Sequence, residues 1–236
     1  QKDDGRLTRR EALSDLVEFR TRLNDQFAYR HLKDIDLDAR LREIGSALSD
    51  EVEISDLAWR LHRLMMTFGD GHARVRSRHF PRAETFPPFL LEPTAEGVIA
   101  FRPDRRRFLD PARPYLVAID GQPLSDLLDA MRPGITDGSP HLVRRRTLRE
   151  VRSLESVRAL LLDQPGRDRV TCTLATGPAD PAPVELELIM SPNRPTYGDW
   201  PRGTSGLLEN NLGYLRLPRM DDDLIPGIRA SMNAFR

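Results

Sequence analysis

The feature that most constrains this fold is a change of hydrophobic period at Gly69 and Gly71. Before these glycines, apolar residues recur every three or four positions, which is typical of amphipathic helices. After Val75, apolar residues come in short runs bounded by Pro, Gly and Asp, which is typical of strands. The sequence therefore predicts an α+β chain with a helical first third and a β-rich middle.

Three helices are predicted before the glycines, and together they would form a small bundle. Thr8 and Glu11 are spaced as a capping box for the first, and Ser55 is the predicted N-cap of the third. The apolar residues expected to face the core are Leu13, Leu16, Val17, Leu23 and Phe27 in the first helix, Leu37, Leu41, Ile44 and Leu48 in the second, and Leu57, Leu61, Leu64, Met65 and Phe68 in the third.

The β-rich middle is predicted to contain five strands and one short helix. The strands read PPFLLEP, GVIAFRP, PYLVAIDGQ, RVTCTLAT and VELELIM, and Asp120-Gly121 is a turn dipeptide. The helix PLSDLLDAM ends at Pro133 and Gly134, and residues 141–162 show helical spacing again. Beyond them, NNLGYLRLPRM indicates another strand, with a helix starting near Asp222.

Composition and motif searches exclude several function classes. The 36 basic and 36 acidic residues balance, which argues against a nucleic-acid partner. No apolar run approaches the roughly 20 residues of a membrane span. The single cysteine, Cys172, excludes an intramolecular disulfide and a multi-cysteine zinc site. No nucleotide-binding glycine motif, HExxH or GxSxG is present, so we expect no metal and no cofactor.

The two ends of the sequence bear on compartment and completeness. The chain opens QKDDGRLTRR without a methionine, which we interpret as a processed or truncated start. We therefore expect an exported or periplasmic protein, although the lone cysteine fits the cytoplasm equally well. The last residues, ASMNAFR, lack a helix C-cap, so we interpret the chain as ending inside an element.

His72 is the candidate catalytic residue, in the stretch FGDGHARV. A glycine-flanked turn leaves an imidazole accessible, and histidine titrates near neutral pH, so His72 is suited to act as a general base. The remaining histidines are interpreted as structural or exposed, and Arg144 to Arg146 as a solvated face. Six serines are interpreted as cap or loop residues because none lies in a nucleophile motif: Ser125, Ser139, Ser153, Ser156, Ser191 and Ser205.

Three stretches, in order, resemble parts of the C-terminal-processing (tail-specific) serine peptidase family, including its tricorn-like branch. LHRLMMTFGDGHARV resembles the helix and turn that end the family's N-terminal domain. PYLVAIDGQPLSDLLDAM resembles the strand, turn and helix of its PDZ-like domain. LLENNLGYLRLPRM resembles the strand that opens its catalytic core. The resemblance spans about residues 8–236.

The resemblance implies an N-terminal helical domain over residues 1–78, a PDZ-like β domain with a helical insertion over 79–195, and the first strand and helix of a truncated α/β catalytic core over 196–236. It implies hydrolysis of polypeptides by a serine located beyond this chain. In the tricorn-like branch the base comes from a turn matching that of His72, whereas another branch uses a lysine. We expect this chain alone to be inactive, with the remainder of the catalytic domain as its partner.

Some residues depart from the family pattern. Gly71 and Ala73 stand where relatives often have Ser or Asp and Thr, and no G-L-G-F-type carboxylate-binding loop is evident. The helix over residues 141–162 is a large insertion. Two alternatives therefore stay open: a stand-alone PDZ-like peptide-binding module without catalysis, and a relative that binds a small apolar ligand.

Overall fold

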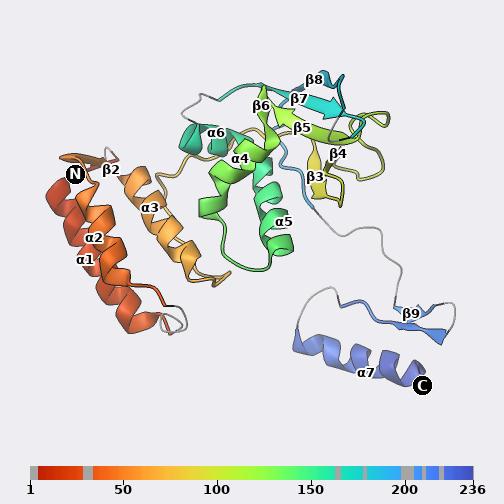
Figure 1. The fold of residues 1–236 in the computed structure, drawn as a ribbon. Helices are drawn as coiled ribbons and strands as arrows, with labels where there is room; N and C mark the ends of the chain where they lie inside the picture. Colours follow the sequence, from red (N-terminus) through yellow and green to blue (C-terminus); the bar gives the residue numbers. More distant parts are fainter. Residues whose placement is uncertain are drawn as a thin grey trace. The chain divides into compact units, whose positions relative to one another are not determined.

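The computed structural model of this protein describes residues 5–28, 34–162, 166–177, 180–197, 205–208, 211–217 and 221–235. The chain forms two compact units, Gln1–Thr196 and Tyr197–Arg236. Figure 1 draws the helices and strands of both units. The predicted mixture of helices and sheet is confirmed.

The helical part contains α1 (Arg9–Gln26), α2 (Leu37–Ser46) and α3 (Ile54–Thr67), which share one apolar core. The predicted capping box is confirmed, since the Thr8 side chain accepts from Glu11 N–H and the Glu11 carboxylate accepts from Thr8 N–H. Two short strands that the sequence did not predict, β1 (Arg6–Thr8) and β2 (Glu51–Glu53), pair antiparallel beside the helices.

Two details of the predicted helices are wrong. The N-cap of α3 is Glu53, not Ser55, because β2 leads directly into the helix and Ile54 N–H donates to the Gly5 carbonyl at 2.9 Å. In α1 the inward stripe runs through Ala12, which is fully buried, whereas Leu13 and Val17 are 39% and 56% exposed. The small side chain, rather than its leucine neighbour, therefore faces the core.

The middle of the chain forms one antiparallel sheet of six strands in the order β3-β4-β5-β7-β8, with β6 paired to β5. The five predicted strands are confirmed, and β6 is a short addition that follows the Asp120-Gly121 turn. Both turn residues have positive φ, 52° and 76°, as a tight hairpin requires. The strands are β3 (Leu90–Pro93), β4 (Val98–Phe101), β5 (Tyr115–Ile119), β6 (Gln122–Pro123), β7 (Arg169–Ala175) and β8 (Val184–Ile189).

Helices α4 (Leu124–Met131), α5 (Pro140–Glu150) and α6 (Leu154–Leu161) lie beside this sheet (Figure 1). The short 3₁₀ turn η2 (Arg132–Gly134) follows α4, as the predicted stop requires. The continuous helix expected over residues 141–162 is wrong in one respect, because the 3₁₀ turn η3 (Val151–Ser153) separates α5 from α6.

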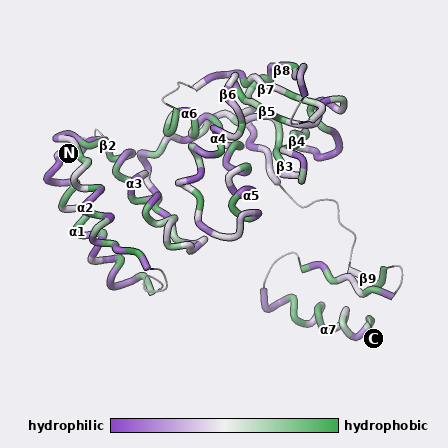
Figure 2. The backbone as a smooth tube through the Cα atoms, viewed as in Figure 1, coloured by the Kyte–Doolittle hydropathy of each residue, from purple (hydrophilic) through white to green (hydrophobic). Residues whose placement is uncertain are grey.

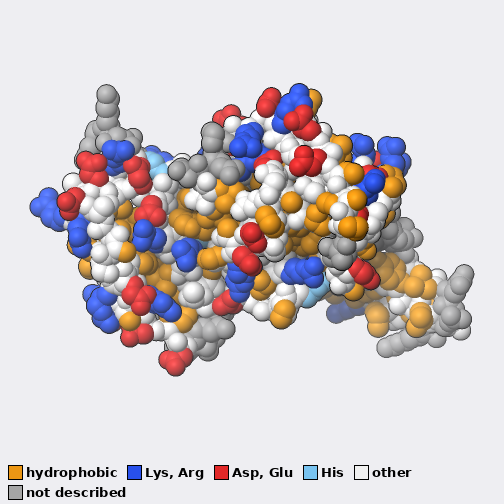
Figure 3. Space-filling model, turned by 45° about the horizontal axis from the view of Figure 1, so that its top comes forward, with side chains coloured by type: hydrophobic (Ala, Val, Ile, Leu, Met, Phe, Trp, Pro, Cys, Tyr) orange, Lys and Arg blue, Asp and Glu red, His pale blue; other side chains and the backbone are white. Residues whose placement is uncertain are grey.

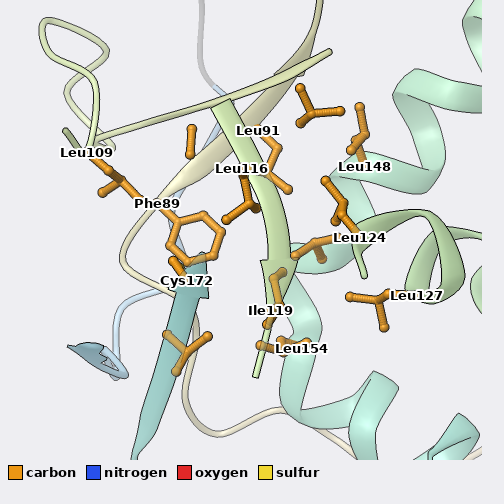
Figure 4. Packing of buried hydrophobic residues seen from close by; sticks show 14 of the residues in the cluster. Phe89, Leu91, Leu109, Leu116, Ile119, Leu124, Leu127, Leu148, Leu154 and Cys172 are labelled. Atoms are coloured by element: carbon orange, nitrogen blue, oxygen red, sulfur yellow. The ribbon is translucent and has the colours of Figure 1, made fainter. Parts of the chain in front are cut away.

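A second apolar core lies between the sheet and these helices. Figure 4 shows Leu116 and Ile119 of β5 and Cys172 of β7 close to Leu124 and Leu154 of the helices. Figure 2 shows hydrophobic and hydrophilic residues alternating along the same elements. Burial of this apolar surface, at about 25 cal/mol per Å², provides the main driving force for the packing of helices on sheet.

An ion pair inside this part of the structure joins three elements. The Arg158 side chain on α6 is fully buried, and its Nε lies 3.1 Å from Asp120 Oδ2, with Nη2 also donating to that oxygen. The other Asp120 oxygen accepts from Thr171 N–H of β7 at 3.0 Å. The Asp120 carboxylate therefore holds α6, β7 and the β5–β6 turn together.

The C-terminal unit contains the paired strands β9 (Gly206–Leu207) and β10 (Gly213–Tyr214), then η5 (Asp222–Leu224) and α7 (Ile225–Ala234). The helix expected near Asp222 is confirmed. Within the described part of the strand expected over NNLGYLRLPRM, residues 211–217, only Gly213–Tyr214 is paired, with the two-residue β9; the ends of the predicted strand lie outside the described residues.

The buried ion pair yields a stability prediction. Asp120→Asn keeps a residue that tolerates positive φ and an oxygen for Thr171, but removes the charge that compensates Arg158. We expect a loss of about 3 kcal/mol or more in the free energy of unfolding, measured by urea denaturation. The double variant Asp120→Asn/Arg158→Met should recover part of this loss, since it buries no unpaired charge. Equal stability of Asp120→Asn and the parent would contradict this role.

Candidate active site and the adjoining cleft

The candidate site begins where α3 ends. Gly69 follows the helix with φ of 71°, and its N–H donates to the Met66 carbonyl at 3.2 Å, which terminates the helix. Asp70 then closes a tight turn, because its Oδ1 accepts from His72 N–H at 2.8 Å and its carbonyl accepts from Ala73 N–H at 3.2 Å. The backbone that carries His72 is therefore held in place by its own local hydrogen bonds.

The imidazole of His72 projects from this turn and is fully exposed. Its Nδ1 lies 3.4 Å from Oδ1 of Asp70, whose side chain is 23% exposed. A carboxylate hydrogen-bonded to one ring nitrogen orients a general base; here the Asp70 carboxylate lies beside the ring, within ion-pair range but without a hydrogen bond to it. Proton abstraction by His72 would require a nucleophile to approach the imidazole.

A cleft of about 560 Å³ adjoins the turn, and Gly71 and Ala73 on either side of His72 line it. Its volume is in the range of ligand-binding sites. The other walls come from α3, from the segment around η2, and from α5, η3 and α6. These walls contribute Trp59, His62, Met66, Arg74, Met131, Gly134, Ile135, Thr136, Arg146, Arg149, Glu150, Arg152, Ser153, Ser156, Val157, Leu160 and Leu161.

His62 packs into the wall of the cleft rather than acting in it. Its ring stacks on Trp59 with centroids 5.4 Å apart, and its Nε2 lies 3.1 Å from the Gly134 carbonyl. Because a carbonyl only accepts, Nε2 donates in this contact, and Nδ1 is buried without a hydrogen-bond partner. Gly134 is required here, since a Cβ at that position would lie 2.3 Å from the Trp59 ring.

The other histidines have varied surroundings. His79 is half-buried, and its Nε2 accepts from Arg78 Nε at 3.3 Å. His141 is exposed near the start of α5, and His31 lies outside the described residues. The backbone N–H of His79 also donates to Ser77 Oγ at 3.1 Å, a local turn contact that does not involve the imidazole.

The serines lie in capping and loop positions where they are described. Ser139 caps α5 by accepting from Leu142 N–H at 3.3 Å, and Ser191 accepts from Asn193 N–H at 3.0 Å. Ser125 donates to Asp126, Ser153 accepts from Arg194, Ser205 accepts from Arg216 N–H, and Ser156 lines the cleft. The structure brings no serine of this group to His72 by a hydrogen bond among the described residues.

The expectation that Arg144 to Arg146 form a solvated face is wrong for two of the three. Arg144 is exposed, but Arg145 forms an ion pair with Glu92 on β3 at 3.2 Å. Arg146 lines the cleft beside Gly71. The helix has these different surroundings because its successive side chains point toward the sheet, the cleft and solvent.

Sequence reasoning missed the cleft arginines and the Trp59–His62 stack. One signal for the arginines was available: Arg146, Arg149 and Arg152 are spaced three residues apart, which places them along one side of a helical segment. Because arginine is abundant throughout the chain, this spacing could not be distinguished from a chance arrangement. The positions of Arg74 and Trp59 opposite that segment depend on tertiary packing alone.

In the residues that the structure describes, no group of three or more His, Cys, Asp or Glu side chains could hold a metal ion. Within the same residues, no helix is both long enough and apolar enough to cross a membrane.

Comparison with known proteins gives a likeness of fold. No family model matches the chain, and neither does any curated protein. Among solved structures, the chain shares its mixed α/β fold over 77% of its length with a longer protein. That protein is CPAF, in a serine-to-alanine mutant, with a TM-score of 0.55 and 16% identity. The structure of mature CPAF matches with a TM-score of 0.49 and the same identity and coverage. The chain spans about a third, 34%, of CPAF.

Cys172, the single cysteine of the chain, is buried and lies in the second apolar core. Burial raises the pKa of its thiol to about 12; the nearby Asp120 carboxylate adds to this rise, and Arg158 opposes it. A thiol with this pKa is about one part in ten thousand ionised at pH 8. Cys172 is therefore unsuited to nucleophilic catalysis.

The state of Cys172 predicts its reactivity. In the folded protein at pH 8, Ellman's reagent should leave Cys172 unmodified for hours, because the thiol is both buried and protonated. In guanidinium chloride the same thiol should react within minutes. A Ser125→Cys variant, whose new thiol would be exposed, is the control and should react at once in the folded state. Rapid modification of native Cys172 would contradict its burial.

Proposed function

We propose that this chain is the N-terminal part of a serine endopeptidase resembling the C-terminal-processing, tricorn-like family, and that His72 is its general base. The nucleophilic serine would lie in the portion that follows Arg236. The observation that carries the proposal is the exposed imidazole of His72, held beside the Asp70 carboxylate at 3.4 Å on a turn that borders a cleft. This geometry suits proton abstraction from a hydroxyl delivered by another part of the protein.

The fold supports the proposal at a coarse level. CPAF is a serine protease, and the likeness covers 77% of this chain at a TM-score of 0.55. The three sequence stretches that resemble the peptidase family lie on α3 and the His72 turn, on β5 to α4, and on β9 to β10. Under the proposal, the sheet with its helices is the PDZ-like domain and the C-terminal unit is the start of the catalytic core.

The proposal extends to partners and compartment. The partners would be a polypeptide substrate and the remainder of the catalytic domain, with no metal or cofactor in the reaction. We propose an exported or periplasmic setting. The 236-residue chain alone would not hydrolyse peptides, because a base without a nucleophile cannot form an acyl intermediate.

A second candidate is a peptide-binding module without catalysis. The observation in its favour is the sheet edge at β8, which in the described residues has no strand on its outer side. An extended peptide can add to such an edge through main-chain hydrogen bonds. Titration with C-terminal peptides should then give saturable amide shifts in Val184–Ile189, and an unresponsive β8 would exclude this mode of binding.

The test of the leading proposal uses the longer protein. Reading the gene beyond Arg236 should find a serine in a turn before a helix within about a hundred residues, the scale of a further domain segment. In that protein, His72→Ala should keep the fold and lower peptide hydrolysis by several orders of magnitude, the scale of triad deletions. His141→Ala makes the same change at another exposed position and should leave turnover unaltered.

Two results would contradict the proposal. A stop codon directly after Arg236 would remove the nucleophile altogether. Unchanged turnover in His72→Ala, with the serine variant inactive, would exclude His72 from the mechanism and favour a serine–lysine arrangement.

A further inference from the structure

The cleft beside the His72 turn carries a local excess of positive charge. Arg74, Arg146, Arg149 and Arg152 line it, against Glu150 as the one carboxylate in its lining. The chain as a whole has 36 basic and 36 acidic residues, and Figure 3 shows the two signs interspersed over the face it draws. The excess therefore belongs to the cleft and does not follow from the general abundance of arginine.

Two of these arginines have no protein partner within the described residues. Neither Arg74 nor Arg146 forms an ion pair or a hydrogen bond there, in contrast with Arg145, the neighbour of Arg146, which pairs with Glu92 at 3.2 Å. The two arginines come from different segments: Arg74 follows the turn after α3, and Arg146 lies on α5. Two guanidinium groups that line one cleft, neither of them paired with a carboxylate of the described residues, form a site for an anion.

Two hydrogen bonds to backbone carbonyls hold the Arg152 side chain at the edge of the cleft. Its Nε donates to the Arg149 carbonyl at 3.0 Å and its Nη1 to the Pro195 carbonyl at 3.4 Å. Backbone carbonyls satisfy the donors and fix the side chain, but they carry no formal charge.

The Arg146 guanidinium lies close to Gly71. A Cβ at residue 71 would lie 3.1 Å from Arg146 Nη2 and 3.3 Å from Nη1, so a larger residue there would require the guanidinium to shift by a few tenths of an ångström. The guanidinium therefore lies against the turn that carries His72.

The lining is not suited to a bare inorganic ion, because much of it is apolar. Trp59 and the aliphatic side chains of Ile135, Val157, Leu160 and Leu161 line the same cleft. At about 560 Å³ the cleft has room for a few side chains of a ligand. The complementary ligand carries an anionic group next to an apolar one.

We infer that the cleft binds a polypeptide segment in which acidic side chains alternate with apolar ones. The choice of a polypeptide rests on the proposed function. A segment bound in the cleft against Gly71 and Ala73 would pass the exposed imidazole of His72. The carboxylates would pair with Arg74 and Arg146, and the apolar side chains would pack on Trp59 and Leu160. Binding itself requires no hydrolysis, so the chain as it stands can be tested.

The test is fluorescence anisotropy with a labelled peptide of about eight residues that alternates Glu and Leu, a length matched to a cleft of this size. We expect saturable binding that weakens with added salt. A peptide with Gln in place of Glu should bind at least about tenfold more weakly, since charge-assisted hydrogen bonds are lost. The variant Arg74→Gln/Arg146→Gln should lose affinity for the Glu peptide by a similar factor.

Controls separate the cleft from general charge effects. Arg144→Gln removes one positive charge from α5 outside the cleft and is matched to Arg146→Gln, which removes one inside it; Arg144→Gln should bind as the parent does, and circular dichroism should show all variants folded. Equal binding of Glu and Gln peptides, or unchanged affinity in the double variant, would overturn the inference. Complete displacement of the Glu–Leu peptide by millimolar phosphate would also overturn it, because the leucine side chains would then contribute nothing. Tighter binding of a single-stranded oligonucleotide than of the peptide would overturn it as well. If the longer protein binds the peptide in this way but does not hydrolyse peptides, the proposed function is refuted and the binding inference is not.

Discussion

The arrangement of the larger unit depends on the buried ion pair of Asp120 and Arg158. A fully buried guanidinium is unfavourable unless a carboxylate compensates it, so Arg158 fixes α6 against the β5–β6 turn and β7. Glu155, on the same helix, accepts hydrogen bonds from the backbone N–H groups of Glu84 and Thr85, both at 2.8 Å. Helix α6 is therefore anchored to the sheet and to the loop before it. Since Val157, Leu160 and Leu161 of α6 line the cleft, the ion pair also fixes one wall of the candidate site.

The sequence predicted the elements of this fold better than their ends. The capping box of Thr8 and the Asp120-Gly121 turn were predicted correctly because each is determined by chemistry within a few residues. The start of α3 was missed because a contact with Gly5, distant in sequence, decides it. The role of Asp120 beyond its turn was also missed, since no local pattern indicates that Arg158 and Thr171 meet its carboxylate.

The candidate site shows the same limit. His72 could be selected from the sequence because glycines flank it and a family resemblance surrounds it, and the structure adds Asp70 as its neighbour. The cleft could not be predicted, because its walls come from α3, the turn after it, η2, and α5 to α6. Gly71 connects the two features: it flanks the histidine and also makes room for Arg146. Positioning of a base and capture of an anionic segment would thus share one turn.

The most direct measurement is a crystal structure of the longer protein with a peptide aldehyde or similar serine-directed inhibitor bound. Our account predicts that the modified serine oxygen lies within hydrogen-bond distance, about 2.6–3.2 Å, of the His72 imidazole, with the inhibitor's peptide chain entering the arginine-lined cleft. A serine whose nearest base is a lysine, with His72 exposed and remote from the inhibitor, would contradict it.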